Sequence, residues 1–234
     1  MEQSIIELQP RLTKHFAKLV DNKKLAHAYL FSGPRGTGKN KLAHWVAQAV
    51  FCKQKQNGYP CLKCNECRRI AQNNQPDVVE IKPEGNSIKV DQIRYLKAEF
   101  VKSGVESNRK LFIIQNAEKM TISAANSLLK FLEEPSGDVT AFLLTDSVNQ
   151  ILPTIISRCQ LVELSSLTLK KLVATLETKG IGADKANLLA HLTNSQKEAR
   201  ELDGDEDFNK LLANVWEWFN QVLRNDWRAF VGVQ

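Results

Sequence analysis

The sequence lacks an apolar run long enough to cross a bilayer, and residues 1–10 lack the basic and then apolar order of a signal peptide. We therefore expect a cytoplasmic protein without a membrane partner. Internal repeats and low-complexity segments are also missing, which excludes solenoid and compositionally disordered classes. The 234 residues, of which 43% are apolar and 25% charged, fit one main globular domain with smaller helical units.

No long block of lysine or arginine accompanies the net charge of +6. Basic residues spread in this way are about as typical of an ordinary solvated surface as of a face that binds nucleic acid. The charge therefore does not identify a partner.

A phosphate-binding loop is present but lacks its final hydroxyl. Residues 33–40 read GPRGTGKN, which matches G-x-x-x-x-G-K-[ST] at every fixed position except Asn40. The glycines allow backbone N–H groups to surround phosphates, and Lys39 is placed to reach the β and γ oxygens. The hydroxyl that is missing at position 40 is the group that holds Mg²⁺. The candidate nucleotide-binding residues are Gly33, Gly36, Thr37, Gly38 and Lys39.

Short apolar runs alternate with amphipathic segments up to residue 165. The run at 25–32 enters the loop and a helical pattern at 41–51 leaves it, which is the context that a phosphate loop needs. Further strands are predicted at 78–81, 111–114, 141–145 and 161–164, and helices at 91–102, 123–134 and 152–157. Pro135 is expected to end the helix at 123–134. This alternation predicts an α/β fold with five buried strands in a parallel sheet.

After residue 165 the pattern predicts helices only, at 167–177, 183–192 and 208–227. The acidic residues 203–207 are interpreted as a linker between the second and third of these helices.

Cysteines are few, and four of the five lie within residues 52–67 at the spacing C-x8-C-x2-C-x2-C. Disulfides are disfavoured because a cytosolic chain keeps its thiols reduced. Cys52, Cys61, Cys64 and Cys67 can instead supply four sulfurs to a closed tetrahedral site, for which Zn²⁺ is the predicted ion and an iron–sulfur cluster the competing interpretation. A closed site has no open position for catalysis, so its predicted role is structural.

Carboxylates are missing where a working nucleotidase needs them. The strand at 111–114 is followed by Gln115 and Asn116 instead of acids that hold Mg²⁺ and activate water. Loss of a general base alone costs about 10²- to 10⁴-fold in rate. We therefore expect no ATPase activity, and the sequence leaves open whether the loop still binds ATP. The alternative is that the acids lie elsewhere, since Asp77 and Glu80 flank another predicted strand.

Four motifs occur together: HAYLFSGPRGTGK at 27–39, the four cysteines, AANSLLKFLEEP at 124–135 and IISRC at 155–159. With these motifs, residues 8–207 closely resemble the delta-prime family of clamp-loader subunits of bacterial DNA polymerase III. The related gamma/tau ATPase family shares most of the motifs but differs at the loop hydroxyl and the acids.

The resemblance implies an AAA+ module with a five-stranded parallel sheet, then a small helical lid and a helical collar domain that builds a five-subunit ring. The implied domains are the AAA+ core at 1–165 with its zinc insertion at 52–67, the lid at 166–206, and the first helix of a shortened collar at 207–234. A shortened collar is expected to leave aromatic side chains exposed. These are Trp216, Trp218, Trp227 and Phe230.

The resemblance also gives a role to Ser157, Arg158 and Cys159. In the family, this Ser-Arg-Cys motif supplies an arginine finger to the ATP of the neighbouring subunit. A guanidinium at a rigid helix end stabilises charge on the transferring phosphoryl group, and a finger in trans contributes about 10³- to 10⁵-fold in rate.

The implied function is that of an ATPase-silent subunit of the DNA polymerase III holoenzyme, a nucleotidyltransferase, that takes part in sliding-clamp loading during DNA replication. Its implied partners are the gamma/tau and delta subunits, with the sliding clamp and primed DNA contacted through the complex. Two alternatives are an active clamp-loader ATPase of the gamma/tau type and a stand-alone nucleotide kinase. The kinase needs an arginine-rich lid, against which the lid composition and the Ser-Arg-Cys motif argue.

Overall fold

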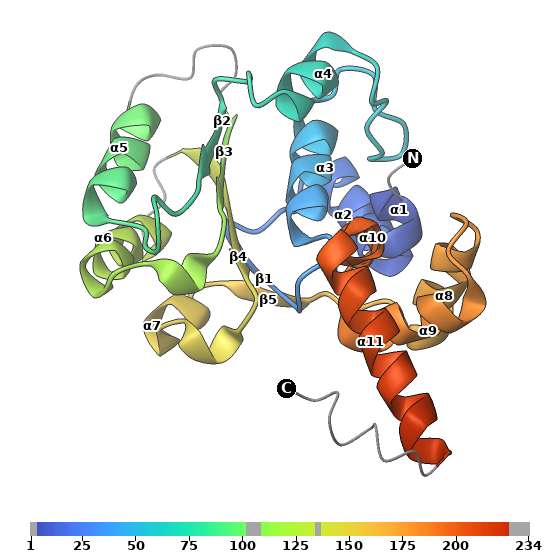
Figure 1. Cartoon of the computed structure of the whole chain (residues 1–234). Helices are drawn as coiled ribbons and strands as arrows, with labels where there is room; N and C mark the ends of the chain where they lie inside the picture. The colour runs from blue at the N-terminus through green and yellow to red at the C-terminus, as the bar shows by residue number, and fades with distance from the viewer. Residues whose placement is uncertain (1–3, 102–108, 134–136, 225–234) are drawn as a thin grey trace. The chain divides into compact units, whose positions relative to one another are not determined.

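The computed structural model describes residues 4–101, 109–133 and 137–224 (Figure 1). Pro135, Trp227 and Phe230, which the sequence analysis singled out, lie outside these residues. The chain divides into two compact units, Met1–Ser166 and Leu167–Gln234. Within the described residues, the helices lack the combination of length and apolar character that a membrane crossing requires.

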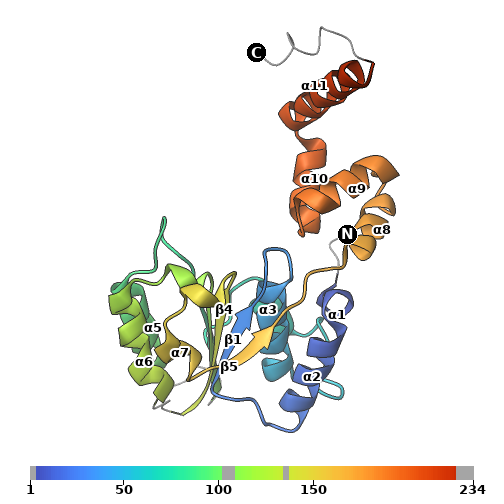
Figure 2. The ribbon, with the colours of Figure 1, turned by 90° about the horizontal axis from the view of Figure 1, so that it is seen from below.

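The first unit contains the predicted parallel sheet with helices on both faces (Figures 1 and 2). Its strands are β1 (Ala28–Ser32), β2 (Val78–Ile81), β3 (Arg109–Ile114), β4 (Asp138–Thr145) and β5 (Gln160–Glu163), in the order β2-β3-β4-β1-β5. Every neighbouring pair is parallel, so the carboxyl ends of all five strands lie at the same end of the sheet. The prediction of five buried strands was wrong for β5, because this strand forms an edge of the sheet and Leu161 is 45% exposed.

Two layers of helices cover the sheet. One layer contains α1 (Ile5–Leu8), α2 (Pro10–Asp21), α3 (Lys39–Phe51) and α4 (Asn65–Ala71); the other contains α5 (Val90–Val101), α6 (Ile122–Glu133) and α7 (Pro153–Ile156). Short 3₁₀ turns, η1 (Ala117–Lys119) and η2 (Val148–Gln150), follow β3 and β4. The sequence analysis missed α1, α2 and α4. The signal for α2 was present, because Pro10 opens it and Thr13, Phe16, Ala17 and Val20 are buried at helical spacing.

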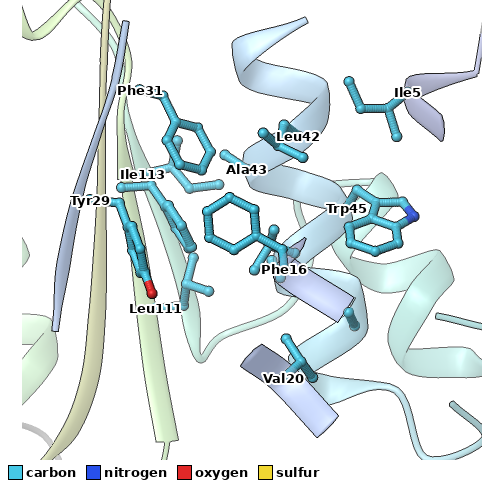
Figure 3. Packing of buried hydrophobic residues seen from close by; sticks show 14 of the residues in the cluster. Ile5, Phe16, Val20, Tyr29, Phe31, Leu42, Ala43, Trp45, Leu111 and Ile113 are labelled. Atoms are coloured by element: carbon cyan, nitrogen blue, oxygen red, sulfur yellow. The ribbon is translucent and has the colours of Figure 1, made fainter. Parts of the chain in front are cut away.

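An aromatic cluster joins α2 to the sheet (Figure 3). Phe16 of α2 lies edge-on to Tyr29 and Phe31 of β1, with ring centroids 5.2 and 5.4 Å apart. Tyr29 also stacks on Phe142 of β4 at 5.5 Å. These fully buried rings fix the strand that leads into the phosphate loop, because edge-to-face and stacked pairs add about 0.5–1.5 kcal/mol each beyond area burial.

The loop between α3 and α4 packs closely on α2 at Gly58. The φ angle of Gly58 is +78°, and a Cβ atom there would lie 1.9 Å from the backbone oxygen of Ala17. We expect Gly58→Ala to lower the free energy of unfolding by about 3 kcal/mol or more, since steric overlap adds to the roughly 1–2 kcal/mol of a left-handed alanine. Gly85→Ala is the matched control, because Gly85 has φ +66° and nothing within 4 Å of its Cβ position. Equal costs in urea unfolding for the two variants would contradict this close packing.

The second unit is helical, as predicted, with α8 (Leu169–Glu177), α9 (Ala183–Leu192), α10 (Gln196–Gly204) and α11 (Glu206–Leu223). The buried side chains that hold α8, α9 and α10 together include Leu172, Leu176, Leu189 and Ala199. Helix α10 was not predicted, and the acidic linker was a wrong interpretation. Asp203 and Gly204 end α10, and the carboxylate of Asp205 caps α11 by accepting from the N–H groups of Asp207 and Phe208.

Helix α11 carries apolar side chains that remain exposed. Trp216 is 55% exposed and Trp218 is 40% exposed, as the sequence analysis expected for these two aromatic residues. Large apolar side chains of the same helix are exposed as well, at Leu211, Val215, Phe219, Val222 and Leu223.

Candidate functional site

The phosphate loop connects β1 to α3, as its motif predicts. Gly36 and Gly38 have φ angles of +81° and +87°, which an L side chain adopts only with strain. At Gly33, a Cβ atom would lie 2.4 Å from the backbone oxygen of Leu164. Glycine is therefore required at three points of the loop. The backbone N–H groups of the loop lie at the amino end of α3, where anions are favoured.

The amino-terminal segment packs against this loop. Ile5 and Leu8 of α1 lie so close to Gly38 that an added Cβ atom would be 2.9 and 2.5 Å from their side chains. The side-chain amide of Gln9 donates to the backbone oxygen of Thr37 at 3.0 Å and to that of Ser165 at 2.8 Å. The loop conformation is therefore held from outside by side chains of this chain.

The cations of the loop contact a carboxylate that the sequence analysis did not single out. Asp146 directly follows β4, and its Oδ1 lies 2.7 Å from Nζ of Lys39. Its Oδ2 accepts a hydrogen bond of 3.2 Å from Nε of Arg35. The signal for this residue was its position one residue after a predicted strand, at the sheet edge where the loop also lies.

The two amides that replace the expected acids lie at the same sheet edge. Gln115 follows β3 and its side-chain amide donates to Oε1 of Glu80, a residue of β2. Asn116 has a φ angle of +49° and donates to Oε1 of Glu118 at 3.1 Å. Neither side chain carries a charge that would bind Mg²⁺ or take a proton from water.

Glu80 is a half-buried carboxylate with cationic and amide neighbours. Burial acts to raise its pKa, but the contacts with His44, Gln115 and Lys82 outweigh burial and hold the pKa below its ordinary value. Nε2 of His44 lies 3.3 Å from Oε1, and Nζ of Lys82 lies 3.6 Å from Oε2. Glu80 therefore remains ionised and is held by residues of this chain, which is a structural role.

The four clustered cysteines converge, as their spacing predicts. All four Sγ atoms lie within 4.8 Å of one another, which suits one metal ion. Four thiolates around zinc at about 2.3 Å are separated by roughly 3.8 Å. Cys52 follows the last residue of α3, and Cys64 and Cys67 lie at the start of α4. The cluster therefore joins two helices of one layer, and its sulfur ligands suit zinc.

Hydrogen bonds and burial act differently on these thiols. Backbone N–H groups of Lys63 and Cys64 lower the pKa of Cys61 to about 6, and the Cys64 contact measures 3.2 Å. Burial raises the pKa of Cys52 and of Cys67, the latter fully buried. A metal ion supplies the positive charge that lets buried thiolates exist, so the donor set fits a structural metal site.

Arg158 stands in the turn between α7 and β5. Its Nη1 donates to the backbone oxygen of Thr154 at 2.8 Å and to Oγ of Ser157 at 3.3 Å. Nε donates to Oε1 of Glu133 at 2.9 Å, and Nη2 pairs with the same oxygen. The Arg158 side chain is 32% exposed, so the group that these contacts orient is still accessible from outside.

Cys159 contributes packing to this turn. Its side chain packs against the buried cluster under α5, α6 and α7, and burial raises its pKa to about 12. A thiol in this state is not a nucleophile.

The phosphate loop and Arg158 lie at opposite ends of the strands. The loop is at the carboxyl ends, and Arg158 is at the amino ends. Arg158 precedes β5, whereas the loop follows β1, and Leu164 at the far end of β5 bonds the backbone of Ser32 at 2.7 Å. The four residues of β5 cover roughly 13 Å at the usual rise of a strand. Arg158 therefore cannot contact a phosphate bound in the loop of its own chain.

Comparisons with known proteins give the family of the chain. A family model described as "DNA polymerase III, delta subunit" matches residues 8–168. The DNA polymerase III subunit delta' of Bacillus subtilis is 41% identical over 228 residues, which cover 97% of this chain and 69% of that protein. The DNA polymerase III subunit tau of the same organism is 39% identical over 170 residues, 72% of this chain and 30% of that protein.

The fold is shared with a solved structure. A gamma subunit-related protein of DNA polymerase III from Thermotoga maritima superposes with a TM-score of 0.52 over 87% of this chain and 66% of that chain, at 24% sequence identity. This likeness concerns the fold alone. The extent of the family match and of the identity to the Bacillus protein decides the assignment: the chain belongs to the delta' subunit family of DNA polymerase III.

Proposed function

We propose that this chain is the ATPase-silent delta-prime subunit of a clamp loader in DNA replication, and that it donates Arg158 to the ATP site of a neighbouring subunit. The observation that carries the proposal is the position of Arg158 at the amino ends of the strands, whereas its own phosphate loop lies at their carboxyl ends. An oriented, accessible guanidinium that cannot serve its own site suits a phosphoryl group held by another chain.

The absence of catalytic groups in the chain's own site supports the same proposal. Gln115 and Asn116 follow β3 in place of acids, and Asn40 offers no hydroxyl to Mg²⁺. The nearby carboxylates of Glu80 and Asp146 already contact lysines of this chain, Lys82 and Lys39. This arrangement favours a silent subunit over the alternative of an active gamma/tau-like ATPase.

The other parts of the chain take their proposed roles from the family. The cysteine insertion binds structural zinc, residues 166–206 form the lid, and residues 207–234 begin the collar through which the ring assembles. Its partners are gamma/tau and delta subunits, and the sliding clamp and primed DNA are reached through the complex, in the cytoplasm. The exposed apolar side chains of α11 support a role for this helix in assembly.

The purified chain should show no magnesium-dependent ATP hydrolysis above the blank. Loss of the general base and of both metal-directed groups predicts this result, since the base alone is worth about 10²- to 10⁴-fold. A sensitive measurement of phosphate release over hours, with a purified gamma/tau subunit as the positive control, tests it. Turnover that Lys39→Ala abolishes would contradict the silent role and support the alternative ATPase.

A further inference from the structure

The ammonium of Lys39 has no donor left for a ligand. Its acceptors are the backbone oxygen of Gly33, the backbone oxygen of Pro34 at 3.0 Å and Oδ1 of Asp146 at 2.7 Å. A lysine ammonium has three N–H donors, so three acceptors use its full capacity. The side chain is only 11% exposed, which leaves little room for water to take part.

The same carboxylate also holds the second cation of the loop. Nε of Arg35 donates to Oδ2 of Asp146, so each carboxylate oxygen has its own cationic donor. Two anionic oxygens bound by a lysine and an arginine at the amino end of a helix reproduce the contacts that such loops make with phosphate oxygens. The carboxylate is therefore chemically equivalent to a phosphate group at this position.

The backbone directs Asp146 toward the loop. Ser32 of β1 and Thr145 of β4 are partners in the parallel register, and Gly33 donates to the backbone oxygen of Thr145 at 3.3 Å. The fully buried Thr145 fixes the next turn, because its hydroxyl accepts from N of Ser147 at 3.1 Å and donates to the oxygen of Ser147 at 3.0 Å. Asp146 lies between these two anchored residues, so its position is set by the sheet.

We propose that Asp146 is a built-in substitute for phosphate that occupies the Lys39 end of the loop and excludes polyphosphate ligands. A phosphate oxygen that approached Lys39 would have to displace a carboxylate of the same charge. The carboxylate thus holds both cations of the loop in place. This inference goes beyond the proposed function, because it concerns the chain's own loop and can be tested without any partner subunit.

The test is calorimetric titration of the full chain with tripolyphosphate and, separately, with ATP, both without magnesium. Asp146→Asn, which keeps the side-chain volume and removes the charge, should bind both ligands about 10- to 100-fold more tightly than the unaltered chain, the equivalent of one charge-assisted hydrogen bond. Asp146→Ser is a second variant of the same design, in case the asparagine variant fails to fold. In the double variant Lys39→Ala, Asp146→Asn the gain should disappear.

Asp138→Asn is the matched control, because Asp138 begins the strand that Asp146 follows and its carboxylate also accepts from an arginine, Arg109, at 2.7 Å. This control should bind no better than the unaltered chain. Equal gains for tripolyphosphate and ATP in the Asp146 variants support the proposal. Unchanged binding in both variants, an equal gain in Asp138→Asn, or a gain for ATP alone would overturn it, since the last result would place the effect outside the phosphates.

Discussion

Replacing Arg158 with alanine in a complex reconstituted with gamma/tau and delta subunits is expected to slow ATP hydrolysis at the adjacent site by about 10³- to 10⁵-fold. The reason is the position of the guanidinium, which stands accessible at the amino end of β5 and is oriented by Glu133 and Thr154. In the transition state, charge spreads over the oxygens of the transferring phosphoryl group, and a positioned cation stabilises that charge more than it stabilises bound ATP. Phosphate release by the complex measures this effect.

Arg158→Lys separates the contribution of the planar guanidinium, which has several N–H donors, from the contribution of its positive charge alone. A lysine places a positive charge but cannot hold two phosphate oxygens with a planar fork, so we expect it to restore only a minor part of the lost rate. Arg94→Ala is the control, because Arg94 is exposed and paired with Asp91 on α5, away from the turn that holds Arg158. Hydrolysis at the full rate in the Arg158→Ala complex would contradict the finger role.

Removing the metal from the cysteine cluster is expected to lower the stability of the first unit by several kcal/mol. Structural zinc sites in small peptides supply about 10–16 kcal/mol at neutral pH. A smaller loss is expected here, because the unit also has large hydrophobic cores that do not depend on the metal. Since 1 kcal/mol corresponds to about 2–4 °C for a chain of this size, a fall in the unfolding temperature of roughly 10 °C is expected. Calorimetric unfolding with and without a strong chelator, together with metal analysis, measures it.

Two cysteine variants separate metal loss from thiol loss. Cys67 is fully buried and belongs to the cluster, so Cys67→Ser should remove the metal and reproduce the chelator effect. Cys159 lies outside the cluster in a partly buried position, so Cys159→Ala should keep the metal and cost about 1 kcal/mol, as an ordinary truncation does. Iron in place of zinc, or chelator-insensitive unfolding, would contradict the structural zinc site.

The sequence alone predicted most of the first unit, because its strands are short apolar runs whose order relative to the loop is distinctive. β2 and α9 have the predicted bounds, and the other predicted strands and helices agree within a few residues where the structure describes them. Helices α1 and α4 were missed because they are short, with four and seven residues, and carry little periodicity. The acidic residues 203–207 read as a linker because a helix cap and a first turn have the same composition as a loop.

The cysteine cluster and the phosphate loop were predictable because each is encoded by local spacing. The carboxylate of Asp146 was not, because its contact with Lys39 joins residues 107 positions apart in the sequence through the pairing of β1 with β4. The pairing of Arg158 with Glu133 depends in the same way on the fold, which brings the last residue of α6 next to the turn before β5. The sequence supplies the chemistry of such residues, and only the fold supplies their partners.

The central claim is that Arg158 acts on an ATP molecule held by a neighbouring chain. The most direct test is to count the ATP molecules hydrolysed per complex in a single round after binding, for complexes with Arg158 and with Arg158→Ala, while nucleotide binding is measured in parallel. Because each chain carries one Arg158, we predict that the variant complex binds the same number of ATP molecules and hydrolyses one fewer. An unchanged number hydrolysed, with binding intact, would contradict the account.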